Sequence, residues 1–116
     1  MEVFKYNDCG VCINPEVVYT SEGCSSLAWA YYQINIAGHG SSWDYGHWSP
    51  GASGPCCSGG KFNCRQAALN ACKEHLLGIA QESINGSGGF NNGSAAVKAS
   101  KLYLEWYASS GQLVLF

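Results

Sequence analysis

The fold is decided by three consecutive pieces of sequence: LAWAYYQINI at 27–36, AGHGSS at 37–42 and WDYGHW at 43–48. Residues 27–36 alternate, which is typical of a strand with one buried face. Ala30, Tyr32, Ile34 and Ile36 fall on one side of this strand, and Trp29, Tyr31, Gln33 and Asn35 fall on the other. Residues 37–42 are turn formers, so residues 43–48 are expected to return as the partner strand of a β-hairpin.

Two helical patterns follow the hairpin. In the first, apolar residues recur at helical spacing, at Ala68, Leu69, Cys72, Leu76, Ile79 and Ala80. Asn63 and Gln66 have the spacing of a capping box, and Asn85-Gly86 offers a left-handed C-cap, so we expect this helix over about 63–83. A second helix is expected over about 94–109, begun by Ser94 and stopped by Gly111, with a stripe of Ala95, Ala99, Leu102 and Trp106 flanked by Tyr103.

Short strands are also predicted upstream of the hairpin. Val3 to Tyr6 and Glu16 to Thr20 have β-branched and aromatic character, and all predicted strands lie before residue 50. We therefore expect an α+β fold in which a three- to four-stranded antiparallel sheet carries two helices on one face. The 116 residues are enough for one core, so the chain is interpreted as a single domain spanning 1–116. Trp29, Tyr32 and Trp106 are the aromatic residues expected in that core.

Charge is scarce. Charged residues make up 12% of the chain, about half the usual quarter. The six Lys and Arg residues form no cluster, so direct nucleic-acid binding through phosphates is not expected. The eight Asp and Glu residues are too few to imitate the phosphates of DNA. A surface so poor in charge tends to associate, which favours a protein that works bound to a partner.

The first residues do not read as a signal peptide, because they include an early acidic residue and no long apolar run. No apolar segment approaches the length of a membrane span. We therefore expect a cytoplasmic protein that does not bind membranes and whose thiols stay reduced.

Seven cysteines suggest two kinds of chemistry. Cys9-x-x-Cys12 has the spacing that lets two thiolates reach one zinc ion. Cys24 would supply a third ligand, and the fourth would come from Cys56, Cys57, His39 or His47. A zinc-stabilised module with Cys9, Cys12, Cys24 and Cys56 as ligands is thus the first alternative, although no second Cys-x-x-Cys pair is present. The simpler interpretation is that the cysteines are reduced, partly buried thiols and that no cofactor is bound.

Cys64 is the second alternative. It is expected at the first helical position, where the helix dipole lowers a thiol pKa, as in papain-like nucleophiles. Such a hydrolase needs an imidazole close by. His75 is in the same predicted helix, and His39 and His47 lie upstream, so the order along the chain would be permuted. We therefore expect no catalytic residue.

Aromatic residues dominate the candidate binding surface. The chain has four Trp and seven Tyr residues, the types that are enriched in interface hot spots. Trp43, Tyr45 and Trp48 precede a Gly/Ser/Pro/Cys loop and are the aromatics expected to be exposed. With His47 and Lys61 they make up the predicted partner-binding set, Trp43, Tyr45, His47, Trp48 and Lys61.

The run from Trp43 to Leu77 resembles a layout found in small proteins of phages and mobile elements, including anti-CRISPR proteins. Its motifs are Trp43-x-Tyr45-Gly46, Pro50-Gly51-x-Ser53-Gly54-Pro55-Cys56 and Phe62-x-x-Arg65-Gln66-Ala67-Ala68-x-x-Ala71. The cysteine-rich N-terminal third and the second helix fall outside the resemblance. It implies a non-enzymatic inhibitor that blocks a bacterial defence nuclease complex by occupying its surface, and it implies no catalytic residue.

Overall fold

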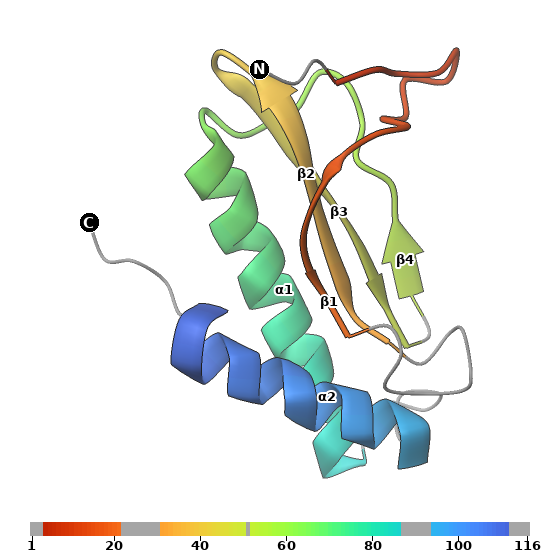
Figure 1. Ribbon diagram of the computed structural model, residues 1–116, viewed down its shortest axis with the longest axis vertical. Coiled ribbons are helices and arrows are strands. Elements are labelled where there is room, and N and C mark those ends of the chain that lie inside the picture. Colours follow the sequence, from red (N-terminus) through yellow and green to blue (C-terminus); the bar gives the residue numbers. More distant parts are fainter. Residues whose placement is uncertain (1–3, 22–30, 51, 87–93, 112–116) are drawn as a thin grey trace.

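A computed structural model describes residues 4–21, 31–50, 52–86 and 94–111. Four strands are followed by two helices (Figure 1). The elements are β1 (Glu16–Thr20), β2 (Gln33–His39), β3 (Ser42–Ser49), β4 (Ala52–Gly54), α1 (Arg65–Asn85), α2 (Ser94–Trp106) and a closing π-helical turn, Tyr107–Gly111. The α+β prediction is confirmed.

The four strands form one antiparallel sheet in the order β1-β2-β3-β4. The predicted hairpin is present as β2 and β3, with His39 opposite Ser42 across a two-residue turn. Two details of the strand prediction were wrong. The last strand, β4, begins after residue 50, and Phe4 to Tyr6 form no strand, because Tyr6 makes only an isolated bridge to Cys12.

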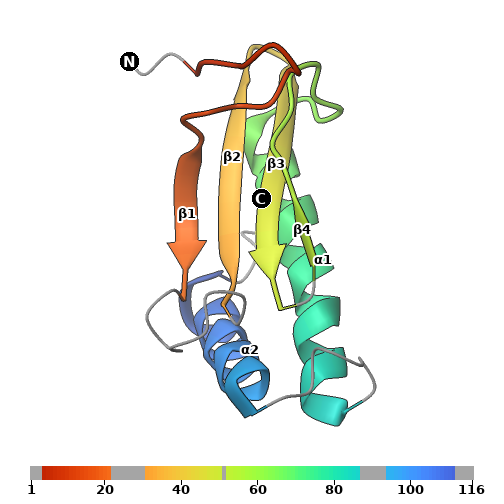
Figure 2. The same cartoon turned by 90° about the vertical axis from the view of Figure 1, so that its right-hand side faces the viewer.

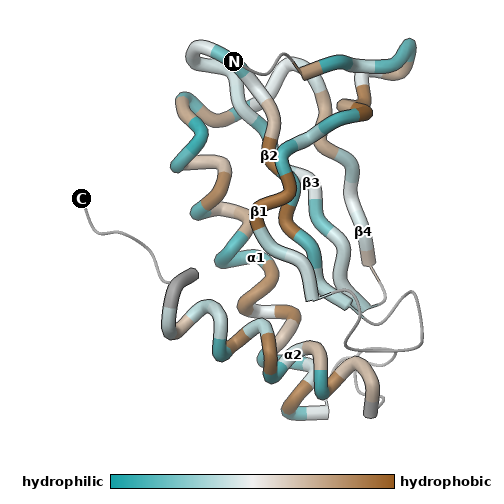
Figure 3. Tube along the Cα trace, in the orientation of Figure 1, coloured by the Kyte–Doolittle hydropathy of each residue, from teal (hydrophilic) through white to brown (hydrophobic). Residues whose placement is uncertain are grey.

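Both helices lie on one side of the sheet (Figure 2). The side chains of Tyr32, Ile34 and Ile36 are fully buried beneath them, which confirms the predicted alternation of that strand for the described residues. The stripe of α1 is also confirmed at Ala68, Leu69, Cys72, Leu76 and Ala80, whereas Ile79 is half-buried. Hydrophobic and hydrophilic residues are interspersed along both helices (Figure 3). The core prediction for Trp29 lies outside the described residues.

The start of α1 differs from the capping-box prediction. Cys64, with extended backbone angles, is the N-cap residue, and its side chain makes no capping hydrogen bond. Asn63 therefore lies one residue outside the cap. Gln66 instead donates a hydrogen bond to Asn70 one helical turn on, at 2.7 Å. The other end is as predicted, because Gly86 adopts the left-handed conformation that closes the helix.

The buried stripe of α2 is rotated from the predicted one. Ala96, Ala99, Ser100 and Tyr103 are buried, whereas Ala95, Leu102 and Trp106 are only half-buried. Tyr32 explains the rotation. Its ring stacks on Tyr103 with centroids 5.3 Å apart, and its hydroxyl lies 2.6 Å from that of Ser100. Trp106 still packs against the core, stacked on Tyr19.

The N-terminal segment, residues 4–14, crosses one end of the sheet face that carries no helix (Figure 2). There Cys12 and Cys56 pack with Ala37 in a second, smaller apolar cluster, which Phe4 and Tyr6 border. This segment does not reach the rest of that face, towards the C-terminal end of β1 and the N-terminal end of β2 (Figure 2). Within the described ranges, neither helix has the combination of length and apolarity that crossing a membrane requires.

Candidate functional site

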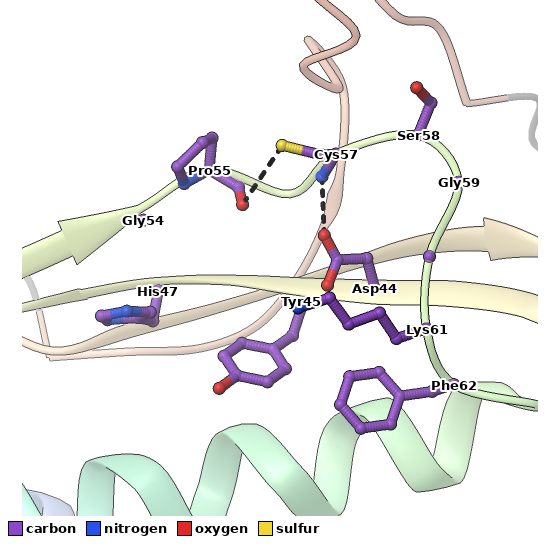
Figure 4. A pocket seen from close by; sticks show the side chains of 11 residues that line it. Asp44, Tyr45, His47, Gly54, Pro55, Cys57, Ser58, Gly59, Lys61 and Phe62 are labelled. Carbon is purple, nitrogen blue, oxygen red and sulfur yellow. Dashed lines mark hydrogen bonds between the residues drawn. The ribbon is translucent and has the colours of Figure 1, made fainter.

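A hollow of about 400 Å³ lies at the edge of the sheet, between β3 and the loop that runs from β4 to α1 (Figure 4). We call it the edge hollow. It is lined by Asp44, Tyr45, His47, Gly54, Pro55, Cys57, Ser58, Gly59, Gly60, Lys61 and Phe62. The rings of Tyr45 and Phe62 lie on its α1 side, with centroids 5.9 Å apart. The loop arches over the hollow from Pro55 to Lys61.

Gly46 positions one end of that loop. A Cβ at this glycine would lie 2.7 Å from the Cys56 backbone nitrogen and 3.0 Å from the Gly54 carbonyl oxygen. The chain therefore crosses β3 here only because residue 46 has no side chain. The Cys57 amide then donates to the Asp44 carboxylate at 2.9 Å, which holds the loop against β3.

The far end of the loop is fixed by backbone pairing. Phe62 and Trp43 exchange both amide–carbonyl hydrogen bonds, at 2.8 and 3.0 Å. Both ends of the loop are thus anchored on β3, and the edge hollow is built into the fold.

Two imidazoles meet beside the edge hollow. The rings of His47 on β3 and His75 on α1 are edge to face, with centroids 4.7 Å apart, and Tyr45 lies next to both. Burial lowers the pKa of His47, and the neighbouring His75 lowers it further. The Nδ1 atom of His47 is buried and has no hydrogen-bond partner among the described residues. The lowered pKa favours the neutral form of the His47 ring, which lines the edge hollow.

A second hollow, of about 290 Å³, lies next to the first. We call it the face hollow. It is lined by Gln33, Asn35, His47, Trp48, Ser53, Gly54 and Pro55. His47, Gly54 and Pro55 border both hollows, so the Gly54-Pro55 segment is the ridge between them.

The face hollow combines an aromatic platform with unsatisfied polar atoms. Trp48 stacks on Tyr31 with centroids 5.6 Å apart and planes within 12° of parallel. The indole nitrogen of Trp48 and the side-chain oxygen of Asn35 are both buried and find no hydrogen-bond partner in the described part of the chain. One is a donor and the other an acceptor, and both are closed off from solvent in this conformation, so a ligand can pair with them only if the two side chains turn outward.

The predicted partner-binding residues are brought together in part. Tyr45, His47 and Lys61 line the edge hollow, and His47 and Trp48 line the face hollow. Trp43 lines neither hollow; it packs edge to face against Phe4. Trp43, Tyr45 and Trp48 were expected to be exposed, but each is half-buried, because neighbouring rings or the loop cover one side of each.

Sequence reasoning missed several residues of these hollows. Asn35 and Gln33 were placed on the correct, polar side of their strand, and that alternation was the signal that could have identified them. Phe62 and His75 are brought beside Tyr45 by the packing of α1 on β3, which no local pattern in the sequence shows.

The cysteines do not form a metal centre in the part of the chain that the structure describes. Cys9 is exposed, Cys12 and Cys56 are buried together, and Cys24 lies outside the described residues. No group of three or more His, Cys, Asp or Glu side chains in the described ranges could hold a metal ion. Every cysteine in those ranges has a free thiol.

Cys64 has no imidazole from α1 near it. His75 is eleven residues further along the same helix axis, which places it about 16 Å away at 1.5 Å per residue. His47 packs against His75 and is carried away from Cys64 with it. Cys64 is exposed at the helix start, without the His75 or His47 partner that a thiol hydrolase needs.

The chain matches no protein-family model, no curated protein and no solved structure. The arrangement of the site is therefore interpreted from its own chemistry. Two adjoining hollows with aromatic walls and a few polar atoms are suited to binding, and neither hollow shows a nucleophile paired with a base.

Proposed function

We propose that this protein is a small protein-binding domain that acts by occupying a partner's surface, without bond-making chemistry of its own. The edge hollow, the face hollow and the ridge between them form the proposed docking surface. One observation supports this most strongly: beside the Tyr31–Trp48 stack, a buried donor and a buried acceptor have no partner in the described part of the chain.

Leaving those two atoms, the Asn35 oxygen and the Trp48 indole nitrogen, without partners destabilises the free protein. A buried polar group without a hydrogen bond costs about 1–3 kcal/mol. If the Asn35 and Trp48 side chains turn outward on binding, a partner that donates to Asn35 and accepts from Trp48 recovers that cost. Because Trp and Tyr are the residues that most often dominate interface energies, the same atoms lie where a hot spot is expected.

The hollows are suited to protruding side chains of a partner. The edge hollow has aromatic rings on one side and Lys61 at its rim, so it can accept an apolar side chain with an acidic or amide neighbour. The low charge of the chain argues against a phosphate backbone as the ligand. The partner is therefore proposed to be a protein.

The partner class comes from the resemblance of residues 43–77 to small phage and mobile-element proteins. On that basis we propose a cytoplasmic inhibitor of a bacterial defence nuclease complex, similar in action to anti-CRISPR proteins. The inhibitor would block the complex sterically.

Affinity capture with matched variants tests the binding surface. Trp48→Ala should remove the principal bound protein, whereas Trp48→Phe, which keeps a ring but loses the N–H donor, should retain a weaker interaction. Lys61→Ala tests the rim, and Lys101→Ala on α2 is its control, because both lysines are exposed. Equal capture by all four variants, each with an unchanged melting temperature, would reject the proposed surface.

A plaque assay tests the nuclease part of the proposal separately. A phage targeted by a host CRISPR–Cas system should form more plaques when the host expresses the wild-type protein. The Lys101→Ala variant should protect the phage from the CRISPR–Cas system as well as the wild-type protein does, and the Trp48→Ala variant should not protect it. If protection is absent in every such host although a partner is captured, the binding proposal stands and the defence-inhibitor proposal fails.

A further inference from the structure

Cys12 and Cys56 lie directly opposite each other where the N-terminal segment crosses the loop. Val11 and Cys57 form an antiparallel bridge there. The Cys12 amide donates to the Cys56 carbonyl at 2.7 Å, and the Ser58 amide donates to the Gly10 carbonyl at the same distance. Stepping one residue from Val11 and Cys57 pairs Cys12 with Cys56.

The two thiols also share one environment. Opposite residues of an antiparallel pair point to the same side, and both side chains enter the small cluster with Ala37. They are 6% and 3% exposed. One hydrogen bond joins the two backbones, from the Cys12 amide to the Cys56 carbonyl. Opposite residues of an antiparallel pair have Cα atoms about 4.5–5.5 Å apart, within the range of about 4.4–6.8 Å that a disulfide spans.

We propose that Cys12 and Cys56 are a disulfide site, which closes when the protein meets an oxidant of the glutathione disulfide class. The two thiols give up two protons and two electrons to form one S–S bond. Glutathione disulfide takes up both and becomes two glutathione thiols. One thiolate first displaces glutathione from its disulfide, and the other then displaces it from the mixed disulfide.

The closed N-terminal segment controls the rate of this exchange. Burial and the neighbouring Asp44 raise the pKa of Cys56 to about 12, so its thiol is unreactive while the cluster is packed. Local opening of the segment removes that burial. We therefore expect slow oxidation that follows the opening of residues 4–14 and is faster in mild denaturant.

The other described thiols are placed less well for this bond. Cys57 alternates to the opposite side of the chain, where it lines the edge hollow and points towards the Pro55 carbonyl. Cys72 is fully buried in the main core on α1. Cys9 and Cys64 are exposed and are available for mixed disulfides with glutathione.

The bond would stiffen one wall of the edge hollow, since Cys57 and Ser58 line it and follow Cys56 directly. Its effect on partner binding rests on the proposed function, but its formation does not. The amides of residues 57–61 should exchange hydrogen at least about tenfold more slowly after oxidation, since a cross-link suppresses local opening.

Peptide mapping of the wild-type protein tests the site directly. After incubation with glutathione disulfide, alkylation and digestion without reductant, the dominant linked peptide should join Cys12 to Cys56. The melting temperature should rise by roughly 8 °C or more, because a cross-link over a loop of this length is strongly stabilising. A dominant link from either cysteine to Cys24, Cys57 or another chain would overturn the proposal, as would glutathione adducts alone.

Variants separate the site from general thiol chemistry. Cys57→Ser should keep both the linked peptide and the shift in melting temperature, and Cys56→Ser should lose both. The peptide map is made on the wild-type protein, so its result holds even if a variant fails to fold. If the bond forms and slows exchange at residues 57–61 while no partner is ever captured, the disulfide site stands and the proposed function fails.

Discussion

Replacing Gly46 with alanine should destabilise the protein and disturb both hollows together. The added Cβ would lie 2.7 Å from the Cys56 nitrogen, 3.0 Å from the Gly54 oxygen and 3.0 Å from the Pro55 carbonyl carbon. All of these are backbone atoms, so no flexible side chain can move aside. Either β3 or the Gly54-Pro55 ridge must shift.

The magnitude follows from the kind of clash. Forcing an extra methyl group into a packed site costs about 1–3 kcal/mol. The upper part of that range is expected here, because the shift also strains the bond from the Cys57 amide to Asp44. In a domain of this size, roughly 4–6 °C of melting temperature correspond to 1 kcal/mol, so Gly46→Ala should melt about 8–18 °C lower.

Gly78→Ala is the matched control. Gly78 is exposed within α1, and a Cβ there would meet nothing within 4 Å. Alanine in a helix is favoured over glycine by about 0.5–1 kcal/mol, so this variant should melt a few degrees higher. Thermal unfolding followed by circular dichroism measures both. If Gly46→Ala melts at or above the wild-type temperature, the loop does not cross β3 at residue 46.

Three further predictions concern the core, the histidines and the thiols. Ser100→Ala should lower the free energy of unfolding, measured in urea, by about 1–3 kcal/mol, because it leaves the buried Tyr32 hydroxyl without a partner. The double variant Ser100→Ala/Tyr32→Phe should lose less than the sum of the two single losses, and strict additivity would argue against the hydrogen bond. Burial and His75 lower the pKa of His47 in the folded protein, so as the pH falls the unfolded state binds a proton at this residue before the folded state does. The contribution of neutral His47 to the free energy of unfolding should therefore be fully present above about pH 6.5 and be lost as the pH falls below that value. His47→Gln should flatten this dependence, whereas His39→Gln, at an exposed position, should leave it unchanged. A thiol reagent at pH 7 should first label the exposed thiols of Cys9 and Cys64. The buried thiols of Cys12, Cys56 and Cys72 should be labelled only on unfolding, and equal labelling rates for all five would count against the fold.

The sheet and the first helix could be predicted because their signals are local. Ile34 and Ile36 alternate with polar residues, and the stripe from Ala68 to Ala80 repeats at helical spacing. One buried face explains each pattern, and tertiary packing agrees with it. The end of α1 could also be predicted, because Gly86 can adopt the left-handed conformation that ends a helix.

The errors arose where tertiary contacts override a local pattern. Ser100 and Tyr103 are buried in α2 because they bond and stack with Tyr32, which is distant in sequence. Cys64 replaces Asn63 as the cap because the loop reaches α1 after pairing Phe62 with Trp43. A helical stripe and a capping motif are local patterns, so they do not predict contacts with residues as distant in sequence as Tyr32 and Trp43.

The candidate site was only partly predictable for the same reason. The aromatic residues of β3 and Lys61 are close in sequence to the loop they border, so they could be identified together. Asn35 lies on β2, and His75 lies on α1. Their places beside Trp48 and His47 depend on strand register and on the packing of the helix, which only the folded chain supplies.

Hydrogen exchange on the complex with the captured partner shows whether the two hollows are the docking surface. In the bound protein, residues 45–48 and 53–62 should be protected, while the exposed face of α2 exchanges as in the free protein. Protection confined to α2, with residues 45–48 and 53–62 unchanged, would show that the partner binds elsewhere.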